Sequence, residues 1–251
     1  MKERIQINAE AIRLREQFGE DPFSPLDIFR LISGNEDLTI AFYPMSSRIS
    51  GIAVRSKNAR IIAINSTSTY GRQRFTAAHE LYHLYYDNEF SVIVCHQEIG
   101  TARTDKEREA DMFASYFLAP YEALRGFVED SLRKTDGTLT VEDVVRIEQH
   151  FGLSRQATLV RLQSEGYLTS TVADTMKTNI IASARKLGFD TSLYMVTPED
   201  RQYATYGKYV ALAELLREKE LISEGKYEEL LLDGFRGDIV FGTNLEEERY
   251  D

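Results

Sequence analysis

Residues 75–86 read FTAAHELYHLYY, the most informative stretch of the chain. It contains an H-E-x-x-H motif, in which His79 and His83 are four residues apart and Glu80 follows the first of them. Residues i and i+4 of an α-helix lie on one face, so both imidazoles can reach a single metal ion. Glu80 then lies beside that face, where it can accept a proton from water instead of binding the metal. The motif therefore predicts a zinc site on a helix over 71–86.

The alternative interpretation is a pair of core histidines that happen to have this spacing. The chain has only four histidines in 251 residues, so chance placement explains the motif poorly. The predicted helix is also apolar on nearly every face, and polar side chains buried there cost several kcal/mol unless they have partners. A metal ion is the simplest partner, and we expect zinc, with manganese or another divalent ion as the alternative.

A catalytic zinc site needs a third protein ligand and one open position, so another segment should contribute. In the predicted helix over 105–118, Glu107 and Asp111 share the face that carries small apolar residues and should meet the core. We predict Glu107 as the third metal ligand and Asp111 as the acceptor for an imidazole N–H. Glu109 lies about 200° around the helix from Glu107 and should be solvated, and it is the alternative ligand.

Other side chains near the motif have weaker claims on the site. Cys95 and His96 are a third possible source of a ligand, although a His/His/Cys set would suit a structural or inhibited site better. A further donor should stabilise a tetrahedral oxyanion. Four side chains are candidates by position, although surface arginines and core tyrosines are the commoner roles: Arg74, Arg103, Tyr82 and Tyr86.

Regular patterns extend outward from the motif in both directions. An alternating run at 38–43 and two runs rich in Ile and Val, at 49–54 and 60–65, are spaced like a small antiparallel sheet. Downstream the pattern is mainly helical. Residues 141–166 resemble a helix-turn-helix unit, but their acidic and basic residues sum to −1. Because phosphate contacts supply most DNA affinity, a packing or partner-docking unit is favoured over a DNA-binding one.

Composition bounds the class of protein. The hydrophobic share of 43% and the charged share of 28% suit a folded chain. One cysteine excludes an internal disulfide and favours a reducing compartment. No apolar run approaches the ~18 residues of a membrane span, and the first residues do not resemble a signal peptide. The net charge of −10 without a basic stripe argues against direct binding to nucleic acid or anionic membranes. We expect a cytoplasmic protein.

Two sequence blocks resemble the ImmA/IrrE family of zinc metallopeptidases. RQRFTAAHELYHLYYD at 72–87 matches the pattern RxxFTxAHExxH, and EREADMFASYFLAP at 107–120 matches E-x-x-A-(N/D)-x-F-A followed by L-x-P. The resemblance covers about residues 8–165. It implies a minimal, mainly helical zincin-like α+β core. It also implies a zinc held by His79, His83 and an acidic residue of the second helix, with Glu80 as catalytic base, and its pattern favours Glu107.

The resemblance also implies a biological role and a division of the chain. Family members commonly cleave, or otherwise inactivate, a helix-turn-helix repressor of a mobile element, prophage or stress regulon. We therefore expect a zinc endopeptidase that acts on such a repressor, and the alternative is a non-proteolytic, antitoxin-like regulator that binds it. The expected parts are a metallopeptidase core at 1–135, a helix-turn-helix-like unit at 136–170 and a C-terminal helical accessory domain at 171–251.

Overall fold

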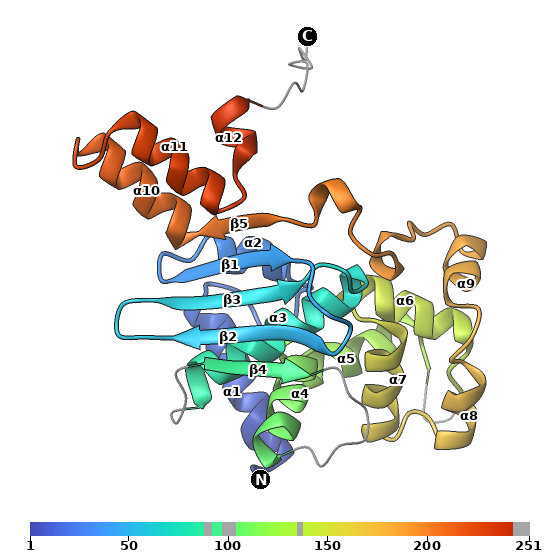
Figure 1. Ribbon diagram of the computed structural model, residues 1–251. Coiled ribbons are helices and arrows are strands. Elements are labelled where there is room, and N and C mark those ends of the chain that lie inside the picture. Colours follow the sequence, from blue (N-terminus) through green and yellow to red (C-terminus); the bar gives the residue numbers. More distant parts are fainter. Residues whose placement is uncertain (88–91, 97–103, 135–137, 243–251) are drawn as a thin grey trace.

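The structure is a computed structural model that describes residues 1–87, 92–96, 104–134 and 138–242 (Figure 1). The α+β class predicted from the sequence is confirmed. The helices and strands follow one another in this order: α1 (Arg4–Gln17), α2 (Ile28–Ser33), β1 (Leu38–Tyr43), β2 (Ile49–Arg55), β3 (Arg60–Asn65), α3 (Tyr70–Tyr86), β4 (Val92–His96), α4 (Asp105–Leu118), α5 (Tyr121–Gly126), a π-helical turn (Phe127–Ser131), α6 (Val141–Phe151), α7 (Arg155–Ser164), α8 (Ser170–Thr175), α9 (Ile180–Lys186), 3-10 turns (Ser192–Tyr194 and Glu199–Arg201), β5 (Ala204–Gly207), α10 (Lys208–Glu218), α11 (Glu224–Asp233) and α12 (Gly237–Phe241).

The sheet has the strand order β4-β2-β3-β1-β5 and is mixed. The pair β2/β3 is antiparallel, as the spacing of the short strands suggested, and the pairs β2/β4 and β1/β5, which the sequence did not predict, are antiparallel as well. The pair β1/β3 is parallel, which corrects the expectation of a wholly antiparallel sheet. The physical reason is that β3 inserts between β1 and β2. Side-chain alternation identifies a strand and its faces, but it carries no information on which strand becomes its neighbour.

The last strand of the sheet comes from the C-terminal segment. β5 pairs antiparallel with β1, with Thr39 opposite Gly207. Gly207 has a φ of +83°, a region that suits glycine, and it leads directly into α10. Figure 1 shows α10, α11 and α12 beyond this edge of the sheet, far from β4. The expected C-terminal helical segment thus also contributes a strand, and its boundary at 170/171 stays a prediction.

Helix α3 forms the centre of the core, between the sheet and the helices α1 and α4 (Figure 1). It packs against β2 and β3 on one side and against α4 on the other. Its small and aliphatic residues Ala77, Ala78 and Leu81 are fully buried. Because α3 is covered on both sides, any polar group on it must find a partner within the protein. Within the described ranges, no helix has the length and apolar character that a membrane crossing needs.

Two expected helices are interrupted in the structure. The helix expected over 121–132 becomes a π-helical turn after α5. The segment expected to be helical over 171–187 is divided into α8 and α9, and Asn179 between them has a φ of +55°. Asparagine tolerates this left-handed conformation better than most residues, so the interruption is encoded locally.

Candidate metal centre

Helix α3 brings the H-E-x-x-H side chains together as its periodicity predicts. The Nε2 atoms of His79 and His83 are 3.2 Å apart. Both histidines and Glu80 between them are buried. The i and i+4 positions therefore aim two imidazole nitrogens at one point beneath the sheet.

Helix α4 adds a carboxylate to this point. Glu107 lies in its first turn, where Thr104 caps the helix by accepting the Glu107 N–H at 3.3 Å. The Glu107 Oε2 atom is 3.3 Å from His79 Nε2, and Oε1 is 3.4 Å from His83 Nε2. The Glu107 side chain is 28% exposed, so the cluster opens to solvent on the α4 side.

The spacing of these atoms fits a single small cation. With metal–ligand bonds of 2.0–2.1 Å, two ligand atoms of a tetrahedral zinc site lie about 3.3 Å apart. The three separations between His79, His83 and Glu107 are 3.2, 3.3 and 3.4 Å. Two imidazoles and one carboxylate are also a common donor set for catalytic zinc. The residues present therefore fit a divalent metal.

The outer nitrogens of both imidazoles face carboxylates. His79 Nδ1 is 3.0 Å from Asp111 Oδ1, the position predicted for Asp111 from the sequence. His83 Nδ1 is 3.4 Å from Asp87 Oδ2, a contact that the sequence analysis did not anticipate. Asp87 follows His83 by four residues, so the same helical spacing that links the two histidines could have identified it. Such carboxylates orient metal-binding imidazoles and raise their basicity.

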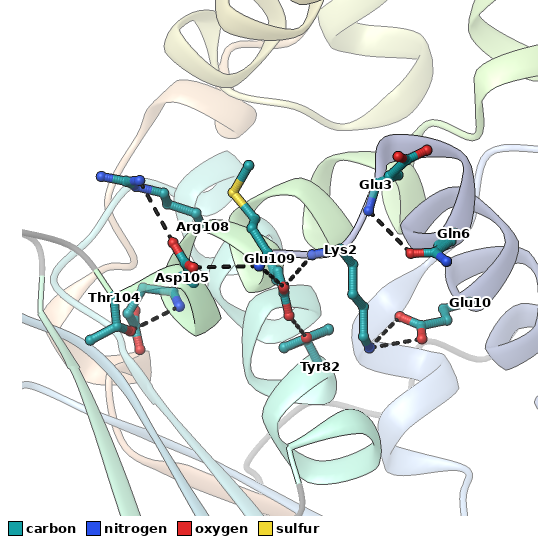
Figure 2. Close-up of polar contacts among 11 residues, drawn as sticks. Lys2, Glu3, Gln6, Glu10, Tyr82, Thr104, Asp105, Arg108 and Glu109 are labelled. Atoms are coloured by element: carbon teal, nitrogen blue, oxygen red, sulfur yellow. Dashed lines mark hydrogen bonds and ion pairs between the residues drawn. The ribbon is translucent and has the colours of Figure 1, made fainter.

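Glu109, the alternative ligand, is buried elsewhere, and the expectation that it would be solvated is wrong. Its Oε2 accepts the hydroxyl proton of Tyr82 at 2.5 Å, and its Oε1 accepts the backbone N–H of Lys2 at 2.5 Å. Figure 2 shows Glu109 between these two partners. The reason is tertiary, since α1 packs against α4 and the residues before α1 cover a helix face that would otherwise meet water.

Glu80 lies in a tight space under the sheet. Its Oε2 accepts a hydrogen bond from Cys95 Sγ at 3.4 Å, whereas its Oε1 is buried and has no hydrogen-bond partner in the part of the chain described. A Cβ atom added at Gly51 would lie 2.7 Å from that Oε1, so only glycine leaves room for the carboxylate there. Burial raises the pKa of Glu80 above its usual range.

Strand β4 places Cys95 in the same cluster. The ligand atoms of His79, His83, Glu107 and Cys95 all lie within 4.8 Å of one another. Among the described residues this is the group of four that could hold a metal ion. From the sequence, Cys95 is expected only as a weaker source of the third ligand, together with His96. The side chain of His96 lies outside the described residues.

The candidate oxyanion donors have other partners. Arg74 is buried and donates to the carbonyl oxygens of Gly152 at 3.1 Å and Leu26 at 2.7 Å. The Tyr82 hydroxyl donates to Glu109, and the Tyr86 hydroxyl donates to the carbonyl of Glu10 at 2.8 Å. Arg74 therefore has a structural role in the core, and the tyrosines are core side chains as expected. The fourth candidate, Arg103, lies outside the described residues.

The shifted pKa values in the cluster favour the release of protons when a cation binds. Burial alone would lower the pKa of His79, but hydrogen bonds with Cys95 and Glu107 raise it to about 10. Burial alone would raise the pKa of Glu107, but hydrogen bonds with His79 and His83 hold it well below its usual range. Without metal, the Glu107 carboxylate thus faces a protonated imidazole at neutral pH.

Metal uptake at pH 7 should release at least one proton. His79, with a pKa of about 10, is protonated before the metal binds and neutral when it is a ligand. Raising the pH from 7 through 10 removes that proton beforehand, so apparent metal affinity should rise across this interval. Isothermal titration calorimetry in two buffers of different ionisation enthalpy measures the released protons. A binding heat that is identical in both buffers would contradict this prediction.

Glu107 and Glu109 should differ sharply in their effect on metal binding. Glu107→Gln should weaken metal binding by more than the roughly 10–100-fold that loss of an outer carboxylate costs. Glu109→Gln should leave metal affinity unchanged, because both oxygens of Glu109 are engaged with Tyr82 and Lys2. Competition with a chromophoric chelator measures both affinities. Metal loss in the Glu109 variant alone would make Glu109 the ligand.

A cavity of about 390 Å³ opens beside the cluster. Asp111, which contacts His79, contributes to its wall. The lining also includes apolar side chains from α3, α4 and α7, and four arginines: Arg4, Arg72, Arg108 and Arg161. The side chain of a bound polypeptide could therefore be accommodated next to the candidate metal ligands.

The fold and the site together define a metallopeptidase. Their common elements are an H-E-x-x-H helix beneath a sheet, a carboxylate from a second helix and a buried glutamate beside the ligands. The model of the family described as Peptidase_M78, IrrE N-terminal-like domain, matches residues 36–163, about half of the chain. The chain belongs to this ImmA/IrrE family of metallopeptidases, as its sequence motifs suggested. A search of curated proteins finds no match.

Proposed function

We propose that this protein is a zinc-dependent endopeptidase. The observation that carries the proposal is the convergence of His79, His83 and Glu107 at the spacing of tetrahedral zinc ligands, with Glu80 buried beside them. A protein that only bound a partner would not need a carboxylate held at Glu80. The family match supports peptide hydrolysis as the reaction.

Each side chain has a separate task in this proposal. A zinc ion, when bound, would supply a Lewis acid that polarises the scissile carbonyl and acidifies water. Glu80 accepts the proton of the attacking water and passes it to the leaving amine. Asp111 and Asp87 hold the outer nitrogens of His79 and His83, which keeps their Nε2 atoms directed at the same point.

The proposed substrate is a helix-turn-helix repressor of a mobile element, a prophage or a stress regulon, and the proposed location is the cytoplasm. Membership of the IrrE-like family supports this substrate class. Cleavage of such a repressor would relieve repression without any contact between this protein and DNA.

The helix-turn-helix-like unit supports the absence of direct DNA binding. Arg155, at the start of α7, and Arg161 are each only 3% exposed. Arg155 forms a buried ion pair with Glu148 of α6, and Arg161 pairs with Glu165 at 2.9 Å. Arg155 links the two helices of the unit, and Arg161 is held at the end of α7 and by Ser115 of α4, so neither is available for phosphate contacts.

The test is a cleavage assay with a purified helix-turn-helix repressor from the genome that encodes this protein. The repressor is incubated with the zinc-loaded protein, with the metal-stripped protein and with the stripped protein after zinc is restored. Intact-mass spectrometry should show two repressor fragments in the first and third reactions only. An unchanged repressor mass in all three reactions, both for wild type and for Cys95→Ala, would contradict the proposal.

A non-proteolytic regulator of the repressor is the second candidate. One observation favours it, since Cys95 adds a fourth ligand-type atom to the cluster. Four protein ligands are typical of structural zinc sites, which have no open position. Binding of the repressor without a change in its mass would support this candidate.

A further inference from the structure

Cys95 has no role in the proposed hydrolysis, although it lies at the centre of the site. β4 pairs with β2, and Cys95 lies opposite Gly51 next to an irregularity in the register. The Cys95 side chain is 2% exposed, and its Sγ donates to Glu80 Oε2 at 3.4 Å. The missing side chain at Gly51 therefore leaves space in which the thiol and the Glu80 carboxylate meet.

The neighbouring atoms indicate that Cys95 is not only a buried core residue but lies among atoms that could bind a metal. Sγ lies within 4.8 Å of the ligand atoms of His79, His83 and Glu107. Cysteine sulfur is a preferred zinc ligand, with bonds of about 2.3 Å. An independent observation is that Glu80 Oε1 is buried and without a hydrogen-bond partner among the described residues. A buried carboxylate oxygen of this kind needs a cation or a donor in the same space.

We propose that Cys95 is a fourth protein ligand of the metal in a resting state of the enzyme, and that hydrolysis requires its release. This inference rests on the metal site of the proposed function. With His79, His83, Glu107 and Cys95 all bound, no coordination position is open to substrate or water. Coordination breaks the Cys95 S–H bond, and the proton passes to Glu80 Oε2, which already accepts a hydrogen bond from this thiol.

The resting state is therefore inactive for two reasons. The thiolate fills the open coordination position. Glu80 already holds the proton from Cys95, so it cannot accept one from water. When Cys95 dissociates as a thiol it takes the proton back, which restores both the open position and the base. The competing explanation is that the thiol is only a hydrogen-bond donor to Glu80, and in that case sulfur never enters the coordination sphere.

X-ray absorption at the zinc edge tests the proposal on the wild-type protein without any substrate. We expect one sulfur neighbour at about 2.3 Å, together with nitrogen and oxygen neighbours at about 2.0–2.1 Å. Cobalt-substituted protein should show a sulfur-to-cobalt charge-transfer band. That band should disappear in Cys95→Ser and Cys95→Ala, while metal stoichiometry stays at one ion per chain. A zinc site with nitrogen and oxygen neighbours alone would overturn the proposal.

Cleavage rates separate this proposal from the proposed function. If both hold, Cys95→Ala should cleave the repressor faster than wild type, because the open position is always available. If sulfur binds zinc but neither wild type nor Cys95→Ala cleaves any repressor, the ligand assignment stands and the peptidase proposal fails. Cleavage by a wild-type protein that has no sulfur neighbour would support the peptidase alone.

Discussion

Replacing Glu80 with glutamine should lower kcat for repressor cleavage by about 10²–10⁴-fold, the usual contribution of a general base. The amide has nearly the same shape as the carboxylate, but it cannot accept the proton of water. Metal content should be unchanged, because His79, His83 and Glu107 are untouched. Single-turnover cleavage followed by mass spectrometry measures the rate, and metal analysis of the same sample measures occupancy.

Glu109→Gln provides the matched control for this experiment. It makes the same chemical change at another buried carboxylate, one whose contacts are Tyr82 and Lys2. Its cleavage rate should stay close to that of wild type. If Glu80→Gln and wild type affected the repressor equally, the peptidase proposal would fail and the non-proteolytic regulator would be preferred.

Replacing Arg155 with methionine should destabilise the protein by about 3–5 kcal/mol, because it leaves a buried carboxylate without its cation. The Arg155 guanidinium pairs with Glu148, which is fully buried, and it also donates to the carbonyl of Met176 at 2.7 Å and to Ser183 at 3.0 Å. It therefore links α6, α7 and the segments around α8 and α9. The melting temperature should fall by roughly 10 °C for a chain of this size.

Two further variants distinguish the stability lost with the Arg155–Glu148 ion pair from a general effect of removing any arginine. Arg146→Met removes an exposed arginine from α6 and should change stability by about 1 kcal/mol or less. The double variant Glu148→Leu/Arg155→Met should recover part of the lost stability, since no uncompensated charge remains. Urea unfolding measures all three variants. An Arg155→Met protein as stable as Arg146→Met would contradict the structural role of the pair.

Local periodicity accounts for the features that could be predicted. Strands β1 and β3 begin and end at the predicted residues, as does α4. The spacing within α3 and α4 placed His79, His83, Glu107 and Asp111 on faces that do meet in the structure. These predictions succeed because a helix or a strand determines the direction of its own side chains within a few residues.

Long-range packing accounts for what could not be predicted. β5 is a run of four residues without a strong alternating pattern, and only its pairing with β1 makes it a strand. Glu109 is a surface position on an isolated helix, and it is buried because α1 and the residues before it pack against α4. In both cases the partner segment is about 100 or more residues away in the sequence.

The metallopeptidase motif can be recognised from the sequence alone, because the H-E-x-x-H spacing and the helical face of Glu107 are properties of single helices. The presence of a thiol beside these candidate ligands depends on the tertiary structure. Cys95 reaches the site because β4 pairs with β2 opposite Gly51, and strand pairing depends on contacts between distant segments. The number of side chains that could bind a metal here, and therefore whether the candidate site is open, thus depends on the folded sheet as well as on the motif.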